Sequence, residues 1–75
     1  MTTIEMEKRL KQKYPQCQVV VFDLTGTNDH FEIRINEPSF AEITRIQQHK
    51  NIMDVFAEEL ASGEVHALAI KTLKI

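Results

Sequence analysis

The sequence predicts a small α+β domain of two layers, in which helices cover a three-stranded mixed sheet. Helix-like spacing marks residues 3–14 and 39–62, and strand-like composition marks 18–24, 30–36 and 65–71. The first two strands are joined by a short turn and should pair antiparallel. The third strand follows a helix, so its connection is a crossover, and the resulting order is helix, strand, strand, helix, strand.

Length and composition limit the classes of function. A chain of 75 residues has room for one domain, here residues 1–75, and such a domain buries only about 60% of its unfolded surface. A deep enclosed active site is therefore not expected. No apolar run is long enough to span a membrane, and the N-terminal residues lack the apolar core of a signal peptide, so we expect a cytoplasmic or organelle-matrix protein without membrane contact.

The first helix is predicted from Thr3 to Tyr14. Ile4, Leu10 and Tyr14 recur at helical spacing among charged residues, and Thr3 is a suitable N-cap. Pro15 then ends the helix. The next residues contain Cys17, the one cysteine of the chain, which has no second thiol for a disulfide or a C-x-x-C site and is expected to be semi-buried.

The first two strands differ in pattern. Residues 18–24 are rich in β-branched side chains, and residues 25–29 have turn chemistry. In the second strand Phe31, Ile33 and Ile35 alternate with polar residues, which is typical of a sheet with one covered face and one solvated face.

The second helix has two candidate starts, because two capping boxes overlap: Ser39 with Glu42, and Thr44 with Gln47. Both starts stay open at this point. One face is predicted to be core, with His49 at its margin, Val55 exposed beside it and Gly63 just past the C-terminus. This face comprises Ile46, Met53, Phe56, Ala57 and Leu60.

The third strand, residues 65–71, should place His66, Leu68 and Ile70 on one face. The opposite face would then carry Val65, Ala67 and Ala69.

From Asp23 onward, several short motifs resemble the BolA-like family. They are Asp29-His30-Phe31 opening a strand, Phe40 after a short loop, Gln48-His49 early in a helix, Glu58-Glu59-Leu60 near its end, and the segment from Val65 to Thr72. The last segment, with His66-Ala67-Leu68 followed by Ile70-Lys71-Thr72, is the most specific of them.

This resemblance implies a fold like a class II KH domain and a non-enzymatic function. It implies a monothiol glutaredoxin as partner, and a [2Fe–2S] cluster shared with the glutaredoxin and glutathione, with none in the isolated apo protein. His66 would supply one ligand, and His30 is the nearest candidate for the second. The roles implied are iron–sulfur trafficking or iron-dependent regulation, by a chain that alone is a monomer or a weak homodimer.

Two other classes of function are weighed against this one. Catalysis is disfavoured, because the sequence contains no Gly-rich phosphate loop and no Cys–His arrangement beyond an isolated thiol. The main alternative is a KH-like nucleic-acid-binding transcriptional regulator of the stress response. The chain has a net charge of −2 and no Gly-x-x-Gly loop, so nucleic-acid binding would depend on a local basic cluster. This cluster comprises Arg45, Lys50, Lys71 and Lys74.

Overall fold

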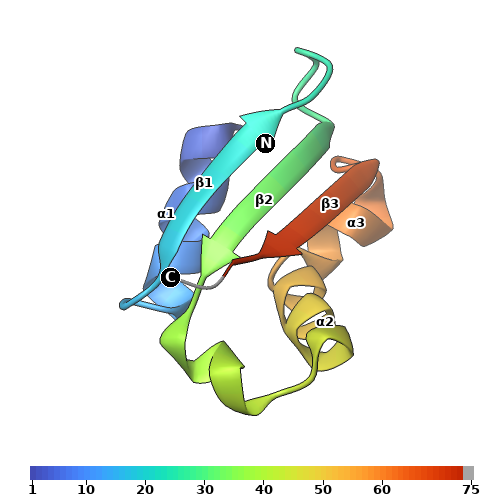
Figure 1. Ribbon diagram of the computed structural model, residues 1–75. Coiled ribbons are helices and arrows are strands. Elements are labelled where there is room, and N and C mark those ends of the chain that lie inside the picture. Colours follow the sequence, from blue (N-terminus) through green and yellow to red (C-terminus); the bar gives the residue numbers. More distant parts are fainter. Residues whose placement is uncertain (74–75) are drawn as a thin grey trace.

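The helices and strands follow the predicted order, with the second helix broken in two. The computed structural model describes residues 1–73, shown in Figure 1. Its elements are α1 (Thr3–Lys13), β1 (Gln18–Asp23), β2 (His30–Asn36), the 3₁₀ helix η1 (Pro38–Glu42), α2 (Arg45–Val55), α3 (Ala57–Ser62) and β3 (Ala67–Thr72). The α+β class with a three-stranded mixed sheet is confirmed. Within these described residues, no helix is long and apolar enough to cross a membrane.

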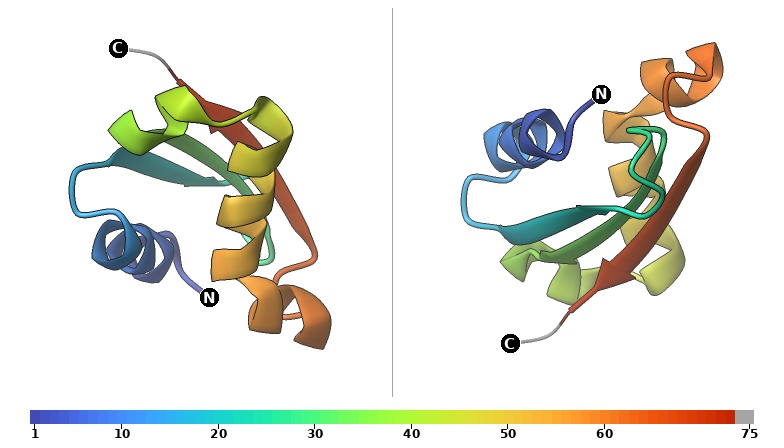
Figure 2. Two further views of the ribbon diagram at one scale, coloured as in Figure 1. Left: turned by 90° about the horizontal axis from the view of Figure 1, so that it is seen from below. Right: turned by 90° about the horizontal axis from the view of Figure 1, so that it is seen from above.

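The sheet has the order β1-β2-β3. β1 and β2 pair antiparallel, with Asp23 opposite Phe31, and β2 and β3 pair parallel, with His30 opposite Ala67. Figure 2 shows α1 and α2 on the same face of the sheet, so the other face is open to solvent. Because β2 and β3 run parallel, both strands begin at the same end of the sheet.

The core lies between the sheet and the helices, and β2 is its centre. Phe31, Ile33 and Ile35 are fully buried, as the alternating pattern predicts, and they form one hydrophobic cluster with buried residues such as Leu10 and Phe56. Each such side chain contributes roughly 1.5–3 kcal/mol by leaving water. The central strand therefore holds both its neighbours and the helical layer in place.

Helix α1 differs from the prediction at its start and on its buried face. Its N-cap is Thr2 and not Thr3, because the Thr2 hydroxyl accepts the Glu5 N–H and the Glu5 carboxylate accepts the Thr2 N–H. Met6 and Leu10, four residues apart, are buried, whereas Ile4 is 77% exposed. The side of the helix that meets the sheet, and not the first apolar residue, decides which side chains are buried.

Of the two candidate starts of the second helix, Thr44 is the N-cap of α2. Its hydroxyl accepts the backbone N–H of Gln47 at 3.1 Å, while Ser39 lies inside η1. Gly63 ends α3 as predicted, in the left-handed conformation with φ of 83°.

The predicted apolar face of this helix is wrong in part. Ile46 and Met53 are 79% and 38% exposed, whereas Ile52 and Phe56 are fully buried. Ile46, Ile52 and Met53 all lie within α2, so the error is one of helix phase: the side that packs on the core carries Ile52, Val55 and Phe56, three and four residues apart. Ala57, also predicted as core, is exposed at the start of α3. Val55, predicted to be exposed, is partly buried against the core, because it lies three residues after Ile52 on the same side of α2.

Strand β3 begins at Ala67, two residues later than predicted. Val65 is buried in the preceding turn, where its N–H donates to the Glu59 carbonyl at 3.1 Å. His66 therefore lies just before the strand and is exposed, while Leu68 and Ile70 form the half-buried face.

Candidate functional site

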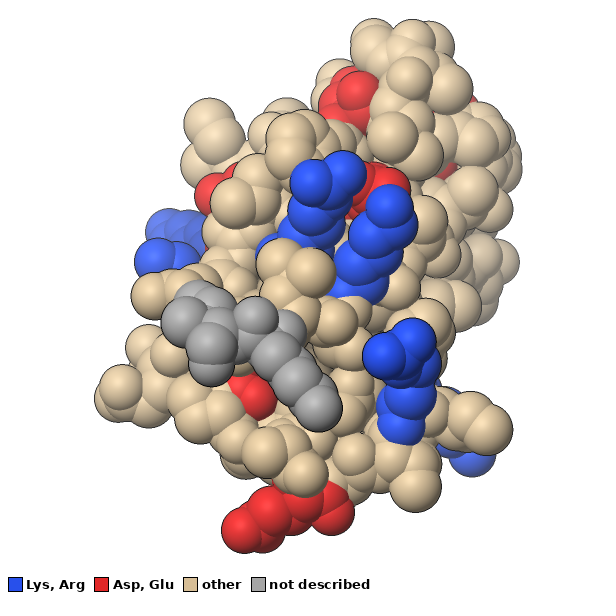
Figure 3. All heavy atoms as spheres, viewed as in Figure 1, with Lys and Arg blue, Asp and Glu red and all other residues tan. Residues whose placement is uncertain are grey.

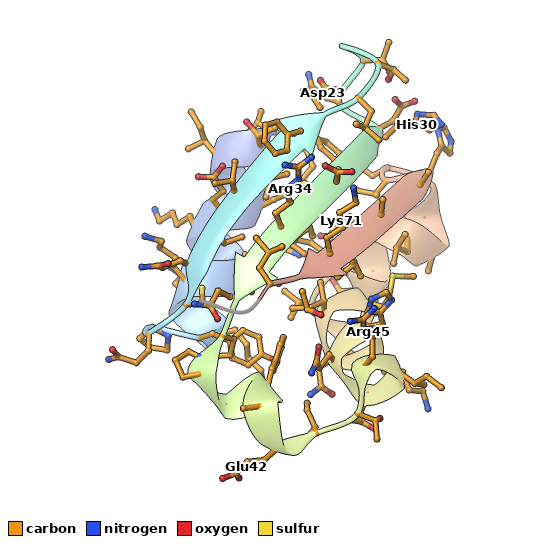
Figure 4. The ribbon with its side chains drawn as sticks, viewed as in Figure 1. Asp23, His30, Arg34, Glu42, Arg45 and Lys71 are labelled. Carbon is orange, nitrogen blue, oxygen red and sulfur yellow. The ribbon has the colours of Figure 1, made fainter. Side chains whose placement is uncertain are left out.

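His30 and His66 meet at the end of the sheet where β2 and β3 begin. His30 is the first residue of β2 and pairs in register with Ala67, so His66 is one residue away from the paired position. The Asp29 carbonyl fixes this arrangement by accepting the N–H groups of His66 and Ala67, at 2.7 and 3.2 Å. The two imidazole centroids are 5.8 Å apart, and Figure 4 shows His30 at this end of the sheet.

The Asp29 carboxylate joins the two histidines. One of its oxygens, Oδ1, lies 2.8 Å from Nδ1 of His30, and the other, Oδ2, lies 3.1 Å from Nδ1 of His66. The three side chains offer metal-binding atoms that all lie within 4.8 Å of one another. The His66 side chain is 60% exposed and that of His30 40%, so the cluster faces solvent.

The loop between β1 and β2 is folded by its own polar side chains. The Asp23 carboxylate accepts three backbone N–H groups, those of Thr25, Gly26 and Asn28. The loop then closes with a bond from the Leu24 N–H to the His30 carbonyl at 2.8 Å. These bonds hold the residues that precede β2, and with them Asp29, in a defined position.

Hydrogen bonds set the charge of Asp29. The Thr27 hydroxyl donates to its carboxylate, and this bond, followed by those from His30 and His66, holds the pKa of the carboxyl far below its usual range. Asp29 is therefore an anion at neutral pH. Among the described residues, no hydrogen-bond partner occupies Nε2 of either histidine.

The structure thus brings the two predicted site residues together and adds Asp29, which the sequence placed only within a motif. Asp29 is recognised as part of the site by a structural feature, the hydrogen bonds of its carboxylate to both imidazoles. His49 is half-buried on α2, at the predicted margin of the core, and is not part of this cluster. Cys17 is buried, and burial raises the pKa of its thiol, which makes it a poor nucleophile.

The predicted basic cluster does not form one patch. Lys71 lies beside Arg34 on the open face of the sheet (Figure 4), where several Lys and Arg side chains are visible among acidic ones (Figure 3). Both contact the Glu32 carboxylate, Lys71 at 3.5 Å and Arg34 at 2.8 Å. Arg45 lies apart from them, at the N-terminus of α2. Lys50 is exposed on α2, and Lys74 lies outside the described residues.

A hollow of about 640 Å³ lies elsewhere, lined by residues that include Phe40, Arg45 and Leu73. It shares no residue with the histidine site, where the His66 side chain is 60% exposed.

Comparisons with known proteins agree on one family. The family model described as BolA-like protein matches residues 2–74. The Rickettsia prowazekii protein RP812 is 34% identical over 71 residues, which cover 95% of this chain and 91% of that protein. The NMR structure of RP812, described as BolA-like, superposes with a TM-score of 0.73 at 31% identity, over 100% of this chain and 96% of that one.

Two further solved structures share the fold. The BolA domain of SufE1 from Arabidopsis thaliana gives a TM-score of 0.80 at 26% identity, covering 93% of this chain and 87% of that one. Yeast Fra2 gives 0.78 at 24% identity, covering 99% and 80%.

Proposed function

The chain belongs to the BolA-like protein family, and on this premise we propose that it acts by binding a monothiol glutaredoxin and sharing a [2Fe–2S] cluster with it. His66 supplies one ligand and His30 the second, and the cellular role is iron–sulfur trafficking or iron-dependent regulation. The observation that carries the proposal is the pair of exposed imidazoles at one end of the sheet.

The residues present fit such a cluster chemically. Imidazole nitrogen is an established ligand of iron, and two histidines can replace two cysteines on one iron of a [2Fe–2S] centre. The replacement of thiolate by neutral imidazole raises the reduction potential of the cluster when it is bound. Because the two histidines would supply only two of the four ligands of the cluster, the partner and glutathione would supply the others, as sharing requires.

Exposure of the site also fits sharing. A cluster held between two proteins must be reached from outside, and the His66 side chain is 60% exposed. Binding without catalysis fits the rest of the described chain, where the cysteine is buried and the hollow lies away from the histidines.

The experiment is a titration of the purified chain into glutaredoxin loaded with [2Fe–2S] and glutathione, followed by visible circular dichroism. The wild type should produce a new spectrum that saturates at one equivalent. His66→Ala should abolish this spectrum, and His30→Ala should weaken or alter it. His49→Ala is the matched control, because it removes a half-buried histidine outside the site.

An unchanged spectrum with the wild type would refute cluster sharing. Equal loss in His49→Ala and His66→Ala would show that the effect comes from the fold and not from ligation. The alternative of nucleic-acid binding is tested by a gel shift at increasing salt, since phosphate contacts weaken steeply as salt rises. Lys71 and Arg34 both pair with the Glu32 carboxylate, which offsets their positive charge. This pairing disfavours phosphate binding and so favours the cluster over the alternative.

A further inference from the structure

A single carboxylate contacts both histidines of the site, and it uses a different oxygen for each. Oδ1 of Asp29 faces Nδ1 of His30 at 2.8 Å, and Oδ2 faces Nδ1 of His66 at 3.1 Å. We propose that Asp29 is the positioning residue of this site. It holds both imidazoles in the Nδ1–H tautomer, so that each presents Nε2 as its metal-binding nitrogen.

The tautomer follows from which atoms can donate. An ionised carboxylate only accepts hydrogen bonds, so a ring nitrogen at bonding distance must carry the proton. A neutral imidazole has one N–H, and when that proton is on Nδ1 the lone pair is on Nε2. The same carboxylate therefore gives both rings the same tautomer. Carboxylates in this position also raise the basicity of the histidine as a ligand.

Asp29 is itself held in place from three sides. Its carbonyl accepts the N–H groups of His66 and Ala67, which ties it to the start of β3. The Thr27 hydroxyl donates to its carboxylate, and the Asp23 carboxylate organises the loop before it. The carboxylate is therefore positioned by the fold before any partner arrives, which lowers the entropy cost of ordering two exposed imidazoles.

The two tautomers are a property of the apo chain alone, whereas their consequence for metal ligation rests on the proposed function. The test therefore begins without metal. Long-range ¹H–¹⁵N correlation spectra of the labelled apo protein, recorded with both rings neutral, report the tautomer of each histidine. We expect Nδ1–H for His30 and His66 in the wild type.

Two substitutions separate positioning from folding. Asp29→Ala should return both rings to the tautomer mixture of free imidazole. Asp29→Asn keeps the shape but has one acceptor oxygen and one donor NH₂, so one ring should keep Nδ1–H while the other changes to Nε2–H. The backbone bonds of Asp29 do not involve its side chain, so both variants should keep them, and amide spectra check the fold. Asp54→Ala is the control, because Asp54 is an exposed aspartate on α2 outside the cluster.

Nε2–H in either ring of the wild type would overturn the proposal, as would Nδ1–H retained by both rings in Asp29→Ala. The glutaredoxin titration supplies a second measurement. There Asp29→Asn should bind the cluster roughly 10–100-fold more weakly than the wild type. If the wild type binds no cluster, the proposed function fails while the tautomer spectra still decide the role of Asp29.

Discussion

Replacement of Gly63 by alanine tests how the chain turns from α3 toward His66. Gly63 has φ of 83° and ψ of 3°, the left-handed conformation that side chains disfavour. A Cβ built at this position would lie 3.8 Å from Nε2 of His66, which is an ordinary van der Waals contact. The substitution therefore introduces backbone strain without a clash.

The cost can be worked out from this geometry. A residue with a Cβ in the left-handed region costs about 1–2 kcal/mol. Alanine also lowers the conformational entropy of the unfolded chain, which offsets about 0.4–1 kcal/mol of that cost. The net loss is on the order of 1 kcal/mol, which for a domain of this size lowers Tm by about 4–8 °C.

Thermal unfolding followed by far-ultraviolet circular dichroism measures this loss. Gly63→Asn should lose less, because asparagine tolerates the left-handed conformation. Gly26→Ala is the matched control, since Gly26 has φ of 75° and nothing within 4 Å of the added Cβ. Unchanged stability in Gly63→Ala would refute the strain argument, and a loss far above that of Gly26→Ala would show that the contact with His66 matters.

Three further predictions concern the scaffold. Ile33→Ala, at the fully buried centre of β2, should lower the free energy of unfolding in urea by about 2–5 kcal/mol. Thr44→Ala, which removes the N-cap of α2, should lower it by about 1 kcal/mol. Arg9 bonds to Glu59 at 2.7 Å and holds the pKa of that carboxyl below its usual value, so the pair stabilises the fold above the unfolded carboxyl pKa of about 4.3 and loses this effect as pH falls through the lower native pKa. Glu59→Gln should therefore cost about 0.2–1 kcal/mol at neutral pH and progressively less in acid.

Each of these has an outcome that contradicts it. A loss below 1 kcal/mol for Ile33→Ala would mean that the site tolerates the cavity better than its burial indicates. Thr44→Ser retains the capping hydroxyl and should be more stable than Thr44→Ala. Equal free energies of unfolding for the two variants would argue against capping. A cost of Glu59→Gln that does not change with pH would exclude the charge of Glu59 as its cause.

The local patterns of the sequence predicted much of the fold. Alternation of Phe31, Ile33 and Ile35 identified the covered face of β2, because side chains on a strand alternate whatever surrounds them. Thr44 and Gly63 act as helix caps through bonds and dihedral angles within a few residues of themselves. Family motifs predicted His66 and His30 as site residues, and the structure brings the two imidazoles together, with centroids 5.8 Å apart.

The sequence by itself determined the order of the elements and the covered face of β2, and it predicted His30 and His66 as site residues. Only the tertiary structure decided which helix faces are buried, as the exposure of Ile46 and the burial of Ile52 show. It also placed Asp29 between two imidazoles: that of His30, which is adjacent in sequence, and that of His66, which is 37 residues away. The physical reason is that the register of two strands and the phase of a packed helix depend on partners distant in sequence, which no local pattern contains.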